Sequence, residues 1–311
     1  MGVYILDMLR SQLLTTLPYP SSDFSGQTVI ITGSNTGLGK EAARHLARLN
    51  AGKIILAVRT LSKGEAAAAE IVTSCNVPAD RLEVWQLDMS VHASIKAFAK
   101  RAGTLGRLDA AILNAGVMTY AWSEIEGTET HMAVNASARQ TGQRGRMTVV
   151  GSGLMRMARL SDLATGGSIF QKLNREGEVP MANYYRTSKL LVYYAVKELA
   201  IRTPVSSESN VCLTIQTPGI CKSDIFRDDV GMLKWLTMGA ATAVLARSTE
   251  VGARTLVHAV NPKLPVEAHG RFLVDCQIAP EGLEYDSEQG PLIAKKWSVE
   301  IWELVKQIES S

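Results

Sequence analysis

The sequence has few cysteines, and they are not arranged as a metal site or a disulfide framework. Four cysteines occur among 311 residues, and none lies in a CxxC pair or at a zinc-ligand spacing. The five histidines also lack a ligand spacing, so we predict no bound metal and expect most of the histidines at surface or capping positions. A few free thiols are typical of a reducing compartment. We therefore expect a cytoplasmic protein.

Long apolar runs, excess charge and biased composition are also absent. No run approaches the roughly 18 apolar residues of a membrane-spanning helix, and the N-terminus lacks the basic start of a signal peptide. The 33 Lys and Arg are scattered and nearly balanced by 30 Asp and Glu, which argues against a nucleic-acid partner. With 46% hydrophobic and 20% charged residues, the composition excludes a disordered or collagen-like chain.

The N-terminal segment has two interpretations. Residues 4–14 are modestly apolar and predict a short amphipathic helix, which either packs on the body of the protein or lies on a membrane surface. Two prolines, Pro18 and Pro20, then interrupt the chain. We divide the chain into an N-terminal extension, 1–23, and a catalytic domain, 24–311.

Strand-like and helix-like segments alternate through the rest of the chain. Short β-branched runs predict strands, which fall at 27–32, 53–58, 82–87, 108–113, 146–150, 210–216 and 271–274. Amphipathic segments between and after them predict helices, which fall at 38–49, 62–74, 92–103, 184–202, 249–260 and 297–308. This alternation is typical of an α/β fold with a single doubly wound parallel sheet and helices on both faces.

The first strand runs directly into a glycine-rich turn and a helix. Glycines at 33, 37 and 39 allow a tight turn and a close approach of the backbone to a pyrophosphate, which the helix N-terminus favours. A strand followed by a glycine-rich turn and a helix is the order typical of a dinucleotide-binding site. We assign to the cofactor Gly33, Ser34, Asn35, Thr36, Gly37, Leu38, Gly39 and Lys40.

Basic residues indicate that the cofactor is NADP(H). Arg59 lies 20 positions after Gly39, where an acidic residue would bind the ribose hydroxyl of NAD. A guanidinium there can instead bind a 2′-phosphate with two hydrogen bonds. Lys40, in the first turn of a helix, opposes the helix dipole and needs an anion nearby.

Further polar residues follow the predicted strands or begin a helix. Asp88, Asn114-Ala115-Gly116 and Ser152 each come at a strand end, the edge where open α/β sheets bind ligands. Tyr185 and Lys189 are one helical turn apart, so the ammonium should lower the pKa of the phenol and suit it for acid–base work.

These motifs occur in one order that resembles the short-chain dehydrogenase/reductase family, whose fold is of the Rossmann type. The resemblance covers roughly residues 24–275, and the segments TGSNTGLGKEAARHLA, AVRTLSKGEAAAAEI, YYRTSKLL and TPGICKSDI look most like the retinol-dehydrogenase-like branch and its fungal members. It implies catalytic roles for Ser152, Tyr185, Lys189 and Asn135. It also implies cofactor contacts at Asp88, Asn114, Ala115, Gly116, Tyr185, Lys189, Pro218, Gly219 and Ser223.

The chain departs from the family pattern after Asn135. Only ten residues separate Asn135 from Arg146, so about four turns of an apolar crossover helix are missing, and a short helix near 129–140 is expected instead. The resemblance implies a homodimer built largely on that helix, so the shortening puts the interface in question.

The sequence therefore supports two functional hypotheses. In the first, the protein transfers hydride between NADP(H) and a lipophilic carbonyl or alcohol. Apolar residues within a substrate rim at 218–247 would contact that substrate, and the reaction would be a tailoring step in fungal specialised metabolism. In the alternative, the shortened helix leaves a catalytically inert protein that binds NADP or a partner.

Overall fold

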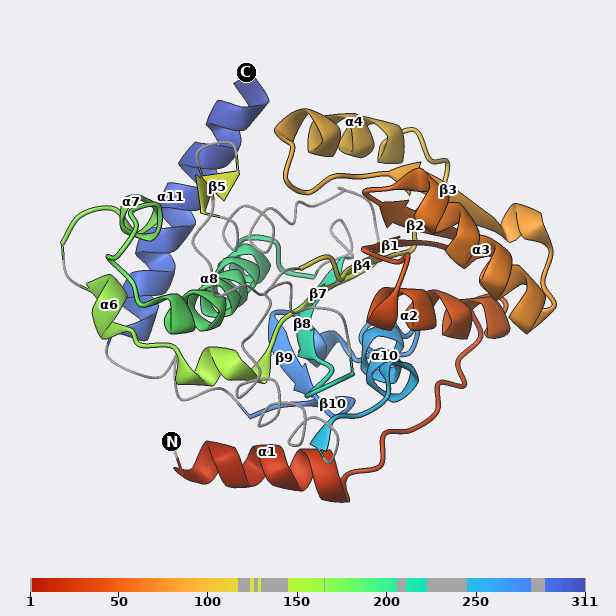
Figure 1. Ribbon diagram of the computed structural model, residues 1–311, viewed down its shortest axis with the longest axis horizontal. Helices are drawn as coiled ribbons and strands as arrows, with labels where there is room; N and C mark the ends of the chain where they lie inside the picture. The colour runs from red at the N-terminus through yellow and green to blue at the C-terminus, as the bar shows by residue number, and fades with distance from the viewer. Residues whose placement is uncertain are drawn as a thin grey trace, which may run out of the picture.

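The chain folds around an eight-stranded sheet (Figure 1). The computed structural model describes residues 2–116, 124–125, 128–129, 145–164, 166–205, 211–222, 245–280 and 289–310. The strands follow the order β10-β9-β8-β7-β4-β1-β2-β3, and all neighbours are parallel except β9 and β10. Their bounds are β1 (Thr28–Thr32), β2 (Lys53–Val58), β3 (Leu82–Gln86), β4 (Ala110–Leu113), β7 (Arg146–Val150), β8 (Cys212–Thr217), β9 (Arg271–Val274) and β10 (Gln277–Ile278). This confirms the predicted doubly wound parallel sheet.

Helices cover both faces of the sheet, which explains its near-continuous apolar strands. Val29 and Ile31 of β1 pack in one core with α2 (Gly37–Arg48), α3 (Leu61–Cys75) and α10 (Thr249–His258). Ile30, between them, points to the other face and packs with α4 (His92–Ala102). Farther along that face, strands β7 and β8 pack against α8 (Met181–Arg202), which α11 (Gly290–Ser310) covers in turn.

Short elements join the long ones. They are η1 (Ala79–Arg81), η2 (Gly153–Met157), α6 (Ser161–Ala164), α7 (Ile169–Leu173), η3 (Val266–Ala268) and the antiparallel pair of β5 (Glu124–Ile125) and β6 (Thr128–Glu129). The predicted helix near 129–140 is wrong at its first residue, because Glu129 pairs with Glu124 in an extended strand. The remaining residues of that prediction, 130–140, lie outside the described part of the chain.

The N-terminal segment forms the predicted helix, α1 (Gly2–Leu14), which lies along the edge of the domain (Figure 1). It packs on the body through hydrogen bonds of Ser11 with Arg247. Three leucines on this helix stay exposed to solvent: Leu6, Leu13 and Leu14. No helix in the described residues is both long and apolar enough to cross a membrane.

Candidate active site

The glycine-rich turn lies between β1 and α2 and is tightly packed. Gly33 and Gly37 have positive φ angles of 64° and 58°, which glycine adopts without strain. A Cβ at Gly39 would lie 2.5 Å from the Gly33 carbonyl oxygen and 2.9 Å from the Ser34 Cα. Only glycine fits there, so the turn keeps its backbone close to the helix N-terminus, where a pyrophosphate would bind.

Asn114 ties this turn to the neighbouring strand β4. Its side-chain amide donates to the carbonyl oxygens of Thr32 (3.0 Å) and Gly33 (3.1 Å). The backbone N–H groups of Asn114 and Ala115 donate to the Thr32 hydroxyl, at 2.9 and 3.0 Å. The structure therefore places Asn114 and Ala115 beside the glycine turn, and Gly116 follows them in the chain.

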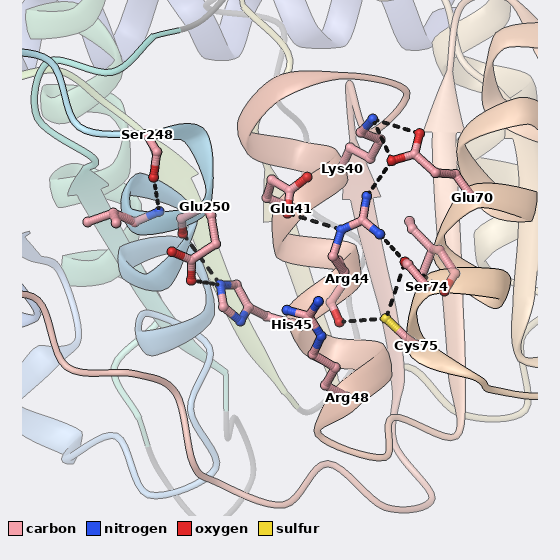
Figure 2. Close-up of polar contacts among 12 residues, drawn as sticks. Lys40, Glu41, Arg44, His45, Arg48, Glu70, Ser74, Cys75, Ser248 and Glu250 are labelled. Carbon is pink, nitrogen blue, oxygen red and sulfur yellow. Dashed lines mark hydrogen bonds and ion pairs between the residues drawn. The ribbon is translucent and has the colours of Figure 1, made fainter.

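The two predicted phosphate-binding cations have different surroundings. Arg59 is exposed just after β2 and has no hydrogen bond or ion pair with any described residue. Lys40 lies 3.0 Å from the carboxylate of Glu70 on α3, and Arg44 lies 2.6 Å from the same carboxylate (Figure 2). Glu70 thus supplies the anion that the position of Lys40 requires, and Lys40 alone does not indicate a phosphate.

Figure 2 also shows a separate contact of a histidine, His45, whose position differs from the one expected for most histidines. His45 was expected at the surface or as a cap, but it is only 1% exposed and lies 3.0 Å from a carboxylate oxygen of Glu250. Burial lowers the pKa of His45, and the Glu250 carboxylate opposes this only in part. This histidine therefore connects α2 to α10 rather than facing solvent.

Asp88 lies two residues after the end of β3, close to where the sequence placed it. Its carboxylate accepts a hydrogen bond from the Ser90 backbone N–H at 3.0 Å and another from the Ser90 hydroxyl. Its backbone N–H donates to the hydroxyl of Ser94 at 2.9 Å. These bonds fix the turn that leads into α4, and β3 pairs with β2, the strand that Arg59 follows.

Three of the predicted catalytic residues come together at the end of β7. Ser152 follows this strand, and its side chain shares a hydrogen bond with that of Tyr185 on α8. Lys189, one turn farther along α8, has its Nζ atom 5.8 Å from the centre of the Tyr185 ring and donates to the Val150 carbonyl oxygen at 2.9 Å. A hydroxyl, a phenol and an ammonium therefore share one site at the carboxyl edge of the sheet.

Burial dominates the electrostatics of this site. It raises the pKa of Tyr185 to about 12, and the hydrogen bond with Ser152 opposes the rise only in part. Burial also lowers the pKa of Lys189 to about 8. The expected lowering of the Tyr185 pKa is therefore wrong in this environment, because desolvation of the phenolate outweighs the hydrogen bond with Ser152. At neutral pH the phenol holds its proton and the amine is charged.

The turn after β8 completes this edge of the sheet. The Thr217 hydroxyl accepts hydrogen bonds from the N–H groups of Gly153 (3.3 Å) and Gly219 (3.2 Å), so Pro218 and Gly219 lie next to the Ser152 segment. Asn135, Ser223 and the central part of the substrate rim, 224–244, lie outside the described residues. Sequence reasoning missed Thr217, although a hydroxyl at a strand end is the same kind of signal that identified Ser152.

The described residues hold no group of three or more His, Cys, Asp or Glu side chains that could bind a metal ion.

Comparisons with known proteins find short-chain dehydrogenases that are similar over most of the chain. A family model described as short chain dehydrogenase matches residues 27–232. The short chain dehydrogenase/reductase dmxR8 of Cryptosporiopsis sp. is 35% identical, covering 98% of this chain and 97% of its own. The short chain dehydrogenase atnD of Emericella nidulans is 36% identical over 87% of this chain and 90% of its own.

Solved structures show the same fold. A protein from Mycobacterium paratuberculosis, described as uncharacterised, matches with a TM-score of 0.65 at 24% identity, covering 95% of this chain and 96% of its own. A short chain dehydrogenase from Burkholderia cenocepacia, in complex with NADP, matches with a TM-score of 0.57 at 19% identity, covering 81% and 96%. The likeness to fungal members of the family, expected from the sequence, is confirmed by the curated relatives. This chain belongs to the short-chain dehydrogenase/reductase family of oxidoreductases.

Proposed function

We propose that the protein is an NADP(H)-dependent oxidoreductase that transfers hydride between the nicotinamide and a lipophilic carbonyl or alcohol. The observation that carries this proposal is the cluster of Ser152, Tyr185 and Lys189, which lies beside the turn after β8 at the same sheet edge as the glycine turn. Proton donor, cation and oxygen-binding hydroxyl are the groups that a carbonyl reduction needs.

The glycine turn fits a dinucleotide. Gly39 leaves no room for a Cβ, and the positive φ of Gly33 turns the backbone sharply ahead of α2. The pyrophosphate would lie on residues 33–39, and the nicotinamide would lie near Tyr185, Lys189, Pro218 and Gly219. When bound, the nicotinamide supplies or accepts the hydride.

Side chains of this protein would donate and accept the proton of the reaction. The substrate oxygen would accept hydrogen bonds from the hydroxyls of Ser152 and Tyr185, which orient the carbonyl. As hydride arrives at the carbonyl carbon, Tyr185 transfers its proton to the oxygen, and the Lys189 ammonium stabilises the phenolate that remains. Alcohol oxidation uses the same groups in reverse, with Tyr185 as the base. Asn135 and Ser223 would assist by holding a water and the carboxamide, respectively.

Arg59 supports the preference for NADP(H) over NAD(H). It is exposed at the end of β2 and its guanidinium is not engaged by any described residue, so it is available for a 2′-phosphate. Lys40 would contribute only by sharing its charge between that phosphate and Glu70. Three of the similar solved structures are described as containing NADP or NADPH.

The lipophilic substrate class rests on the composition of the substrate rim and on the relatives. Large apolar side chains are frequent between 218 and 247, including Ile225, Phe226, Leu233 and Trp235. Similar curated proteins come from fungi such as Emericella nidulans. We place the reaction among the tailoring steps of fungal specialised metabolism.

The cofactor assignment is tested by titrating the protein with NADPH and NADH while nicotinamide fluorescence and the melting temperature are followed. We expect tighter binding of NADPH, and Arg59→Asp should weaken NADPH binding about tenfold to a hundredfold while sparing NADH, as loss of a charged hydrogen bond predicts. Lys263→Asp, the same charge change at an exposed position after α10, is the control. An unchanged preference in Arg59→Asp would remove Arg59 from the site. Nucleotide binding without turnover of any carbonyl in a broad lipophilic panel would favour the inert alternative.

A further inference from the structure

The turn Pro218–Lys222 lies between the two halves of the candidate active site. On one side, Thr217 bonds both Gly153 and Gly219, which links the turn to the Ser152 segment. On the other side, a Cβ at Gly252 of α10 would meet Cys221, Pro218 and also Leu38 of the glycine turn. A displacement of this turn would therefore change the spacing between the cofactor and Ser152.

Helix α1 holds this turn through Gln12. The hydrogen-bond network assigns the Gln12 amide so that its nitrogen donates to the carbonyl oxygens of Ile220 (3.1 Å) and Leu245 (3.0 Å). Its oxygen accepts from the Ile220 N–H at 3.2 Å. One side chain of the N-terminal helix thus satisfies both backbone groups of Ile220, in the middle of the turn.

Arg247 makes a second connection between α1 and the turn. It is only 8% exposed, and its guanidinium donates to the Ser11 carbonyl oxygen at 2.6 Å and to that of Pro218 at 3.4 Å. The Ser11 carbonyl is in the last turn of α1, where carbonyl groups lack a partner within the helix and a cation is favoured. Asp275, 2.9 Å away, balances the charge of this buried arginine.

Backbone pairing joins Arg247 to the turn as well. The Lys222 N–H donates to the Arg247 carbonyl oxygen at 3.0 Å, and the Arg247 N–H donates to that of Ile220 at 2.9 Å. Gly219 has a φ of 76°, and a Cβ there would clash with the Gln12 amide and lie 3.1 Å from the Arg247 guanidinium. The backbone conformation of the turn therefore allows α1 to pack against it.

We propose that helix α1 is a positioning element of the cofactor site, which acts through Gln12 and Arg247 to hold the turn Pro218–Lys222. This inference rests on the proposed function, which assigns Pro218 and Gly219 to the cofactor. Under the proposed function, the adenosine and the pyrophosphate would bind at the ends of β1 and β2, whereas α1 contacts the turn after β8. Loosening the turn therefore affects the nicotinamide end of the cofactor and leaves the adenosine end unchanged.

The test compares Gln12→Ala with Arg10→Ala, a matched truncation on the exposed side of the same helix. Binding of NADPH and of 2′-phospho-ADP-ribose, which lacks the nicotinamide ring, is measured by calorimetry. Gln12→Ala should bind NADPH about fivefold more weakly, the loss of about one net hydrogen bond, and bind the fragment as the wild type does. Arg10→Ala should change neither. Equal weakening of both ligands would overturn the inference, because α1 would then only stabilise the fold, and so would unchanged binding of NADPH.

Hydrogen exchange tests the turn without any nucleotide. The amide of Ile220 should exchange faster in Gln12→Ala and be unchanged in Arg10→Ala; equal protection in both variants would refute the role of Gln12. Arg247→Lys keeps a positive charge opposite Asp275 but loses the guanidinium N–H groups that reach Ser11 and Pro218. This variant should repeat the effect of Gln12→Ala. If the wild type binds no nucleotide, the proposed function and this inference both fail. If the wild type binds NADPH and Gln12→Ala does not weaken it, only this inference fails.

Discussion

Replacing Lys189 should stabilise the folded protein at neutral pH, because keeping its amine charged in a buried position costs free energy. Burial lowers its pKa from 10.5 to about 8. At about 1.4 kcal/mol for each tenfold change, keeping the amine charged at pH 7 costs the folded state about 3 kcal/mol. Lys189→Met removes this cost but leaves the Val150 carbonyl without its hydrogen bond, which costs about 1 kcal/mol. We expect a net gain of about 2 kcal/mol in the free energy of unfolding.

The gain should depend on pH with a defined sign. Because the folded pKa is below the unfolded one, the unfolded chain binds a proton more readily between about pH 8 and about pH 10.5. The wild type should therefore gain stability relative to Lys189→Met across this range, and the difference should vanish or reverse near pH 10.5. Urea denaturation at pH 7 and pH 10 measures it. Lys197→Met, on the same helix, is the control and should change stability little at either pH.

A destabilised Lys189→Met at pH 7, or a difference that does not change with pH, would refute this reasoning. Either result would mean that the ammonium of Lys189 is better solvated than its buried position implies.

Three further predictions follow from other parts of the molecule. Glu70→Gln should remove the ion pair of Glu70 with Lys40 and tighten NADPH binding relative to NADH binding, which a nucleotide titration would show. Glu300→Gln should lower the free energy of unfolding by about 1–3 kcal/mol, because this carboxylate accepts from the N–H groups of Ile169 and Phe170 at the start of α7; urea denaturation would show it. Burial lowers the pKa of His45, so the neutral imidazole contributes its full stability above about pH 6.5, and this contribution is lost as the pH falls. The melting temperature should therefore decrease from pH 7 to pH 5.5, and it should decrease less steeply in His45→Gln.

Exposed acids on the same helices provide controls for the two glutamate variants. Glu65→Gln on α3 should leave the nucleotide preference unchanged, and Glu303→Gln on α11 should leave the free energy of unfolding within about 0.5 kcal/mol of the wild type. Equal effects of Glu65→Gln and Glu70→Gln would argue for a general change of surface charge. A fully stable Glu300→Gln would mean that an amide caps α7 as well as a carboxylate does.

The sequence predicted those parts of the protein that depend on local pattern. The seven parallel strands of the sheet follow from alternating apolar segments, whereas the short antiparallel strand β10 was not predicted. The pairing of Tyr185 with Lys189 follows from their spacing of one helical turn. The position of Ser152 beside them follows from the rule that the carboxyl ends of parallel strands share one edge of a sheet.

What the sequence could not predict depends on contacts between distant residues. Arg247 and Ser11 are 236 positions apart, and neither belongs to a recognisable motif. Lys40 forms an ion pair with Glu70, 30 positions later in the chain. Because Glu70 already supplies an anion, the charge of Lys40 does not by itself indicate a phosphate. The pKa of Tyr185 depends on how much water reaches its hydroxyl, and spacing along a helix carries no information on that.

The most direct test of the central claim is a single-turnover measurement on Tyr185→Phe with bound NADPH and a lipophilic ketone that the wild type reduces. Phenylalanine keeps the ring and its packing but has no proton to give, so NADPH affinity should stay within about twofold of the wild type. Hydride transfer should fall by roughly a hundredfold to ten-thousandfold, the usual contribution of a positioned proton donor. Hydride transfer at the wild-type rate in this variant would contradict the account, because the site would then reduce its substrate without Tyr185.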